Sequence, residues 1–271
     1  MEIGVIVPLK RDMIEEKIKE VHDHGFSVCQ LTCWDIDMLD AGTASLVKAA
    51  LEKYGVRIST IWCGWNGPRA WNFTDGPLTL GLVPAAFRFE RLNNLKKGSD
   101  FAKMLGVDKL ATHVGFIPED MNSTTYRELL AVLKDIVAYC RKNGQSFLFE
   151  TGQETPVTLL RTIEDIGGDN VGINLDPANL ILYGKANPVD ALDVFAKYVK
   201  DVHAKDGLYP TDGKRLGKEV RVGEGKADFP RLIAKLKECG YDGTLIIERE
   251  ISGEQQAKDI QLTKEYLESL I

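Results

Sequence analysis

Three carboxylates and one histidine stand at the ends of four strands predicted in the second half of the chain. The segments SFLFE, VGINLD, YVKDVH and TLIIE end with Glu150, Asp176, His203 and Glu248. In a closed parallel barrel, the carboxyl ends of neighbouring strands converge at one rim. Three carboxylates and an imidazole that meet there form a site for a divalent metal ion.

The chemistry of such a site follows from its donors. One neutral imidazole and three carboxylates carry a charge of about −3, which suits Mn²⁺ best, with Mg²⁺, Co²⁺ or Zn²⁺ as alternatives. The ion would polarise the carbonyl of a bound hydroxy-ketone and stabilise an enediolate. Glu150 and Glu248 are the predicted catalytic acid/base pair, because their strands lie on different sides of the ring. Proton transfer on opposite faces gives epimerisation, transfer on one face gives aldose–ketose isomerisation, and loss of a hydroxyl gives dehydration.

Aromatic residues are expected to bind the substrate beside this site. Trp34 follows the second strand, and Trp62 and Trp65 belong to the long Gly- and Pro-rich connection after the third strand, which also carries Trp71. Connections of this length usually form lids or binding loops. Indole rings suit the apolar face of a sugar, although they also plug barrel mouths and dimer interfaces.

Three polar residues are further candidates for substrate binding. His113 ends the fourth strand on its inward face. It is expected to contact the substrate or to support the site, and a hydrogen-bonded core histidine is the alternative. Lys205 points the same way as His203, two positions earlier, and is expected to hold a substrate oxygen or a phosphate. In RVGEG, Arg221 is a candidate for binding an anion or a hydroxyl, and the two glycines permit close backbone approach.

The order of predicted elements would bring these residues together. Eight strands alternate with eight helices, from MEIGVIV to a last helix over residues 254–270. This alternation predicts an α/β fold, a single (β/α)8 TIM barrel over residues 1–271, which agrees with about 250 residues for such barrels. Asp12 is expected to cap the first helix, and a polar loop to follow His203. A doubly wound sheet is disfavoured, because PLKRDM replaces the GxGxxG turn after the first strand.

The composition and charge of the chain limit the classes of molecule that it is expected to bind. The net charge of −6 is spread along the chain, which favours neither a nucleic-acid-binding nor a membrane-binding surface. Five cysteines without a CxxC pair indicate reduced thiols and a cytoplasmic location, and no leader segment precedes the first strand. An abasic-site endonuclease on the same barrel would need a histidine-rich three-zinc cluster and a basic face, whereas this chain has four histidines.

The motifs NLDPANLILYG, VHAKDG, RVGEGKADFP and GYDGTLIIERE resemble the xylose isomerase-like TIM-barrel family of sugar phosphate isomerases and epimerases. That family includes ketose 3-epimerases, hydroxypyruvate isomerases and inosose dehydratases. The resemblance implies the same metal ligands and the same glutamate pair as the strand ends do. It also implies a substrate contact three residues after the strand-six aspartate, where ketose epimerases have histidine and this chain has Asn179. Asparagine hydrogen-bonds a hydroxyl but does not relay a proton.

The expected function is therefore metal-dependent isomerisation or epimerisation of a sugar, sugar phosphate or keto-polyol. The alternatives are an inosose dehydratase-like lyase that uses the same enediolate and a non-catalytic sugar-binding barrel. A small-molecule carbohydrate is the expected partner, and a homodimer or homotetramer is compatible with the sequence.

Overall fold

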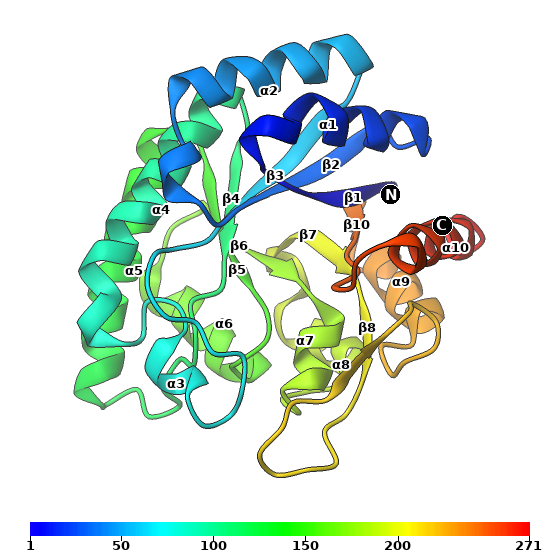
Figure 1. Ribbon diagram of the computed structural model, residues 1–271. Helices are drawn as coiled ribbons and strands as arrows, with labels where there is room; N and C mark the ends of the chain where they lie inside the picture. The colour runs from blue at the N-terminus through cyan, green and yellow to red at the C-terminus, as the bar shows by residue number, and fades with distance from the viewer.

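Eight parallel strands close into a barrel that helices surround in the computed structural model, which describes residues 1–271 (Figure 1). The barrel strands are β1 (Glu2–Pro8), β2 (Val28–Cys33), β3 (Arg57–Cys63), β4 (Lys109–Thr112), β5 (Ser146–Glu150), β6 (Val171–Leu175), β7 (Val199–Ala204) and β10 (Thr244–Ile247). Each pairs with the next barrel strand in the chain, and β10 closes the ring on β1. The predicted single (β/α)8 TIM barrel is confirmed.

The outer helices follow the barrel around (Figure 1). They are α1 (Ile14–Asp23), α2 (Ala41–Tyr54), α4 (Ala85–Leu105), α5 (Thr124–Lys142), α6 (Pro156–Ile166), α8 (Pro188–Phe195), α9 (Phe229–Glu238) and α10 (Glu254–Glu268). Their apolar faces pack on the strands: α1, for example, buries Ile14, Ile18 and Val21, which repeat at helical spacing. Asp40 caps α2 as its position suggests, because its side chain accepts a hydrogen bond of 2.7 Å from Thr43 N.

The expected cap at Asp12 is wrong. A 3-10 turn (Arg11–Met13) precedes α1, and neither Lys10 nor Met13 gives a side-chain cap. The backbone N–H of Met13 donates to the carbonyl of Lys10, so a backbone carbonyl of the turn, and not a side chain, accepts the hydrogen bond at the start of the helix.

Four short elements were not predicted. The long connection after β3 contains α3 (Gly76–Thr79), and DPANLIL forms α7 (Pro177–Leu182). The polar segment after β7 is a two-stranded antiparallel hairpin of β8 (Asp206–Leu208) and β9 (Lys218–Val220). These elements are too short for a hydrophobic period to show, although the Asp-Pro pair at the start of α7 is a recognisable helix signal.

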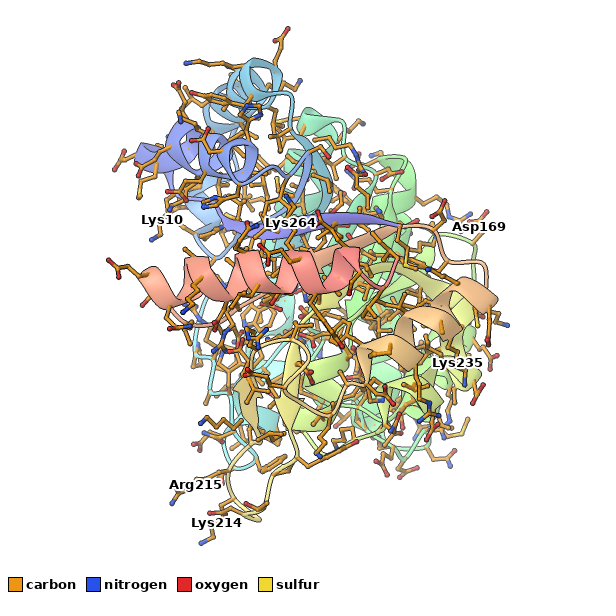
Figure 2. All side chains as sticks on the ribbon, turned by 90° about the vertical axis from the view of Figure 1, so that its right-hand side faces the viewer. Lys10, Asp169, Lys214, Arg215, Lys235 and Lys264 are labelled. Carbon is orange, nitrogen blue, oxygen red and sulfur yellow. The ribbon has the colours of Figure 1, made fainter.

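The two ends of the barrel are distinguishable in Figure 2, where Lys10, which follows β1, and Asp169, which precedes β6, lie on opposite sides of the molecule. The carboxyl ends of the strands therefore face the side of Lys10. Lys214 and Arg215 mark the tip of the hairpin loop, which projects from the body of the molecule. None of the helices is long and apolar enough to cross a membrane.

Candidate active site

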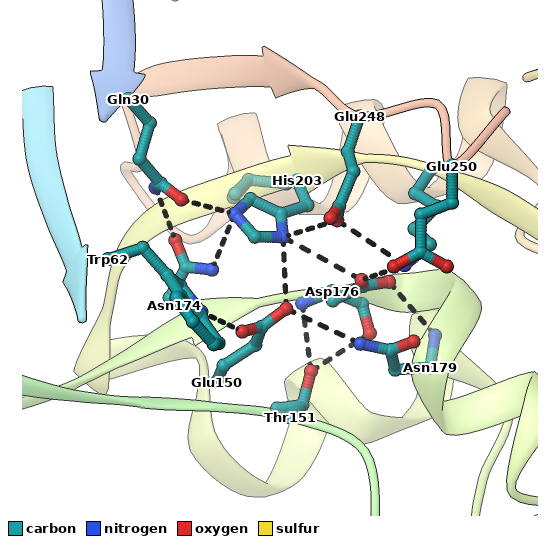
Figure 3. Close-up of polar contacts among 12 residues, drawn as sticks. Gln30, Trp62, Glu150, Thr151, Asn174, Asp176, Asn179, His203, Glu248 and Glu250 are labelled. Carbon is teal, nitrogen blue, oxygen red and sulfur yellow. Dashed lines mark hydrogen bonds and ion pairs between the residues drawn. The ribbon is translucent and has the colours of Figure 1, made fainter. Parts of the chain in front are cut away.

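Glu150, Asp176, His203 and Glu248 meet at the carboxyl ends of β5, β6, β7 and β10, which are consecutive in the barrel (Figure 3). One ligand atom from each residue lies within 4.8 Å of the others. His203 Nδ1 is 3.2 Å from Glu150 Oε1, 3.0 Å from Glu248 Oε2 and 3.7 Å from Asp176 Oδ2. The convergence expected from the strand ends is therefore present in the fold.

Three of the facing atoms lack a hydrogen-bond partner. Asp176 Oδ2, His203 Nδ1 and Glu248 Oε2 are buried and unpartnered, although Asp176 Oδ1 accepts a hydrogen bond of 2.9 Å from Asn179 N at the start of α7. Buried polar atoms are normally satisfied, since desolvating them without a partner is costly. A cation placed among them would satisfy all three at once. The residues present thus fit a divalent metal ion.

The carboxylates also make the local potential negative. Burial lowers the pKa of His203, but Glu248 and Glu150 outweigh it and hold that pKa well above its ordinary value. Burial likewise lowers the pKa of Lys205, and the carboxylates, Glu248 foremost, raise it well above its usual range. Both shifts have the same origin as the attraction that the cluster exerts on a metal ion.

Glu150 is held from both sides. Its Oε2 accepts a hydrogen bond from Trp62 Nε1, and its Oε1 lies 3.4 Å from Asn179 Nδ2 (Figure 3). Oε2 also lies 3.3 Å from His113 Nε2. Burial raises the pKa of Glu150, but His113 and His203 lower it by more, so the net shift is downward. Burial also lowers the pKa of His113, and Glu150 offsets this only in part. Glu150 is thus an oriented carboxylate beside the imidazole of His113.

A cavity of about 260 Å³ opens above the cluster. Trp34, Trp62 and Trp71 line it, with ring centroids of Trp34 at 4.8 Å from Trp62 and 6.3 Å from Trp71. Trp65 does not line it: the side chain is buried behind Trp34, 5.3 Å between centroids, and below Arg91. Trp65 therefore supports the wall instead of presenting a face to a ligand.

A close backbone approach makes room for this aromatic wall. A Cβ on Gly64 would lie 2.3 Å from Trp34 Cε3. Any side chain at this position would displace the Trp34 ring from the cavity.

Among the polar candidates, His113, Asn179 and Lys205 line the cavity, and Arg221 does not. Lys205 Nζ lies 3.4 Å from Glu248 Oε2, 3.5 Å from Asp176 Oδ2 and 3.2 Å from Glu250 Oε1. Arg221 pairs instead with Glu224, three residues on, at 2.7 Å.

The RVGEG segment takes this position because it wraps an internal carboxylate. Asp206 accepts hydrogen bonds from the backbone amides of Gly207, Gly223, Gly225 and Ala227, at 2.8 to 3.1 Å. A Cβ on Gly225 would lie 2.0 Å from Asp206 Oδ1. The glycines of this segment thus allow close approach to Asp206 of the chain itself.

Several cavity residues were not singled out from the sequence. Tyr183 directly follows α7, Leu216 lies in the hairpin loop, and Glu250 lies in the segment after β10. Behind Tyr183, the side chains of Gln153 and Glu154 are buried with unpartnered polar atoms, and burial raises the pKa of Glu154 to about 8. Their sequence signal is weak, since GQET resembles an ordinary solvated loop before a capped helix.

The loop that carries Trp71 is fastened from below by Arg91 of α4. Its guanidinium donates to the carbonyls of Thr79 and Gly81 (2.7 Å each), of Pro68 (2.7 Å) and of Asn66 (3.2 Å). The side chain is almost fully buried. The aromatic wall is therefore preformed.

Comparison with known proteins places the chain among similar barrels. The sequence model of a family described as "Xylose isomerase-like TIM barrel" matches residues 18–270. A xylose isomerase domain protein from Planctomyces limnophilus is 34% identical, with a TM-score of 0.93, over 99% of this chain and 96% of that one. A D-tagatose 3-epimerase-like protein is 23% identical, with a TM-score of 0.75, over 100% and 98% of the two chains. A probable 3-DHS dehydratase from Bacillus anthracis is 16% identical, with a TM-score of 0.72, over 98% of each. The last two likenesses concern the fold alone.

Proposed function

Because the chain belongs to the xylose isomerase-like TIM-barrel family, we propose that it is an enzyme, a divalent-metal-dependent isomerase or epimerase of a carbohydrate. The observation that carries this proposal is the meeting of four strand-end ligands, three of them with unpartnered buried atoms. Glu150, Asp176, His203 and Glu248 would hold the ion, with Mn²⁺ as the first choice and Mg²⁺, Co²⁺ or Zn²⁺ as alternatives. When bound, the ion would supply Lewis-acid polarisation of the substrate carbonyl.

The chain's own residues would move the proton. Glu150 and Glu248 face the cavity from β5 and from the end of β10, on the two sides of His203. A C–H next to a carbonyl between them would lose its proton to one carboxylate, with the electron pair passing into the enediolate. The other glutamate, in its acid form, would return a proton on the opposite face. The Trp62 N–H and His113 keep Glu150 oriented for this transfer.

The charge distribution favours an uncharged substrate. Lys205 is the only lysine or arginine that lines the cavity, and three carboxylates already surround its ammonium group. A phosphate would find no unpaired lysine or arginine there and would face Glu248 and Glu250. Trp34, Trp62 and Trp71 instead offer apolar faces for a sugar ring. We therefore favour a free ketose or keto-polyol over a sugar phosphate.

A dehydratase would share the first proton transfer, and a barrel of that activity class is among the similar folds. The two reactions differ in what leaves the enediolate. An epimerase returns a proton to carbon, whereas a dehydratase expels a hydroxyl and gives a product lighter by one water.

The test is solvent exchange in D₂O with the purified protein, loaded with Mn²⁺, and a panel of free ketoses, ketose phosphates and inososes. We expect deuterium to enter a free ketose or keto-polyol at the carbon next to the carbonyl. Glu150→Gln and Glu248→Gln should abolish this exchange while keeping the fold. Loss of water from the product would favour the dehydratase. Wild-type turnover in either variant, or no metal by elemental analysis after incubation and washing, would refute the proposal.

A further inference from the structure

The two ring nitrogens of His203 face different surroundings. Nδ1 faces Glu150 and Glu248 at 3.2 and 3.0 Å, on the side of the proposed metal ion. Nε2 points into the barrel, 2.7 Å from Gln30 Oε1 and 2.9 Å from Asn174 Nδ2 (Figure 3). A neutral imidazole binds a cation only through its unprotonated nitrogen, and the partner of the other nitrogen sets which one that is.

Below His203, Asp201 is completely buried and surrounded by donors. Its two oxygens accept from five groups: the hydroxyls of Ser59, Thr60 and Thr244, the amide of Gln30 and the backbone N–H of Val202. None of these partners is a lysine or an arginine. Because a carboxylate only accepts hydrogen bonds, each group that faces Asp201 must turn a donor toward it.

Gln30 lies between Asp201 and His203 and must satisfy both. Its Nε2 is 3.4 Å from Asp201 Oδ2 and 3.3 Å from Asn174 Oδ1, so the amide nitrogen faces two acceptors. Turning the amide around would set Oε1 against the Asp201 carboxylate. Oε1 is thus held toward His203 Nε2, and it accepts a hydrogen bond there only if Nε2 carries the proton.

The contact from Asn174 favours the opposite tautomer. Its side-chain N–H₂ group, at 2.9 Å, donates a hydrogen bond to Nε2 only if Nε2 is unprotonated. Both demands cannot be met at one nitrogen. The Gln30 contact is shorter, and the orientation of Gln30 is fixed by a carboxylate, whereas the side chain of Asn174 contacts only Gln30 and His203. The stronger electrostatic constraint decides for Nε2–H.

We propose that Gln30 is a positioning residue that holds His203 in the Nε2–H tautomer, so that the lone pair of Nδ1 points at the metal ion. This inference rests on the proposed metal site. Gln30 does not line the cavity and is not one of the four clustered residues. It acts across 173 positions of sequence, from β2 to β7, with Asp201 as its anchor.

The experiment compares Gln30→Met with Thr60→Val. Both substitutions remove a buried hydrogen bond to Asp201, but Thr60 does not contact His203. Mn²⁺ affinity is measured by titration calorimetry on metal-stripped protein. We expect Gln30→Met to weaken binding about 10- to 100-fold and Thr60→Val to change it less than about 3-fold. Gln30→Asn is a second variant, which guards against a packing defect in Gln30→Met: it keeps the amide but withdraws its oxygen from His203.

A second readout is the NMR signal of the His203 Nε2–H in the Mg²⁺-loaded protein, assigned with His203→Gln. We expect a hydrogen-bonded, exchange-protected proton in the wild type and in Thr60→Val, and its loss or displacement in both Gln30 variants. Wild-type affinity and an unchanged Nε2–H signal in the Gln30 variants would overturn the role of Gln30 while leaving the metal site intact. A wild-type protein that binds no divalent cation would overturn both proposals.

Discussion

The indole nitrogen of Trp62 donates a hydrogen bond to Oε2 of Glu150 inside the cavity. The two residues come from β3 and β5, on either side of β4. Trp62 therefore has two functions in one side chain, because its face lines the cavity and its edge orients a carboxylate that accepts only. The other oxygen of Glu150 remains turned toward His203.

Replacing Trp62 by Phe keeps an aromatic face and removes this donor. We expect kcat to fall about 10- to 100-fold with little change in KM, since the lost hydrogen bond orients the base and does not hold the sugar. Steady-state kinetics on the substrate found by deuterium exchange measures both parameters. Trp34→Phe is the control, because the structure gives the Trp34 indole no hydrogen bond to Glu150. Equal kinetics in Trp62→Phe and the wild type would contradict the assignment.

Replacing Arg91 by Met should loosen the loop that carries Trp71. The substitution leaves four loop carbonyls without their donor, so we expect a loss of about 3 kcal/mol in the free energy of unfolding and a raised KM. Urea unfolding and substrate saturation are the measurements. Arg69→Met is a matched control, because Arg69 is exposed and only stacks on Trp34, at 4.4 Å from its ring centroid. A similar loss in both variants would show that Arg91 does not fasten the loop.

Replacing Asp206 by Asn should destabilise the loop before α9. An amide group cannot accept from all four backbone N–H groups that the carboxylate serves, so we expect a cost on the order of 3 kcal/mol. Denaturant unfolding measures it. Arg221→Ala, in the same loop, removes only a partly exposed pair with Glu224 and should cost less than about 1 kcal/mol. It should also leave KM unchanged, whereas a tenfold rise would place Arg221 at the substrate.

Glu154 should make stability depend on pH. Burial raises its pKa from 4.5 to about 8, so the folded state holds the proton more tightly than the unfolded chain does. The contribution of this group to stability is therefore fully present below about pH 4.5 and is lost as the pH rises through 8, a decline of about 5 kcal/mol because one pKa unit corresponds to about 1.4 kcal/mol. Glu154→Gln cannot ionise, and we expect its thermal midpoint to fall less between pH 6 and pH 9. Parallel profiles of the two proteins would refute this.

Removing the metal ion should lower stability. A ligand that binds the folded state alone adds about 2.7 kcal/mol at 100 times its Kd, and without it the clustered carboxylates repel one another. We expect chelation to lower the melting temperature and added Mn²⁺ to restore it. Asp176→Asn should lose most of this response. Glu250→Gln should keep it, because Glu250 lies beside Lys205 and outside the ligand cluster. No response in the wild type would argue against a resident ion.

The sequence by itself determined the barrel and the positions of the four clustered residues at its strand ends. Alternating strands and helices specify a parallel barrel, and the carboxyl ends of its strands must meet at one rim. Local patterns therefore suffice for Glu150, Asp176, His203 and Glu248. The short helix α7 and the hairpin were missed, since three to six residues carry too little periodicity.

Only the tertiary structure decided how the surrounding side chains are used. Trp65 lies buried behind the cavity wall, where Arg91 of α4 stacks on it, and RVGEG closes around Asp206 instead of around a ligand. The links from Asp201 through Gln30 to His203 join residues up to 173 positions apart. The strand period fixes which face a side chain takes, but its hydrogen-bond partner depends on which distant donors and acceptors the closed barrel brings within about 3 Å.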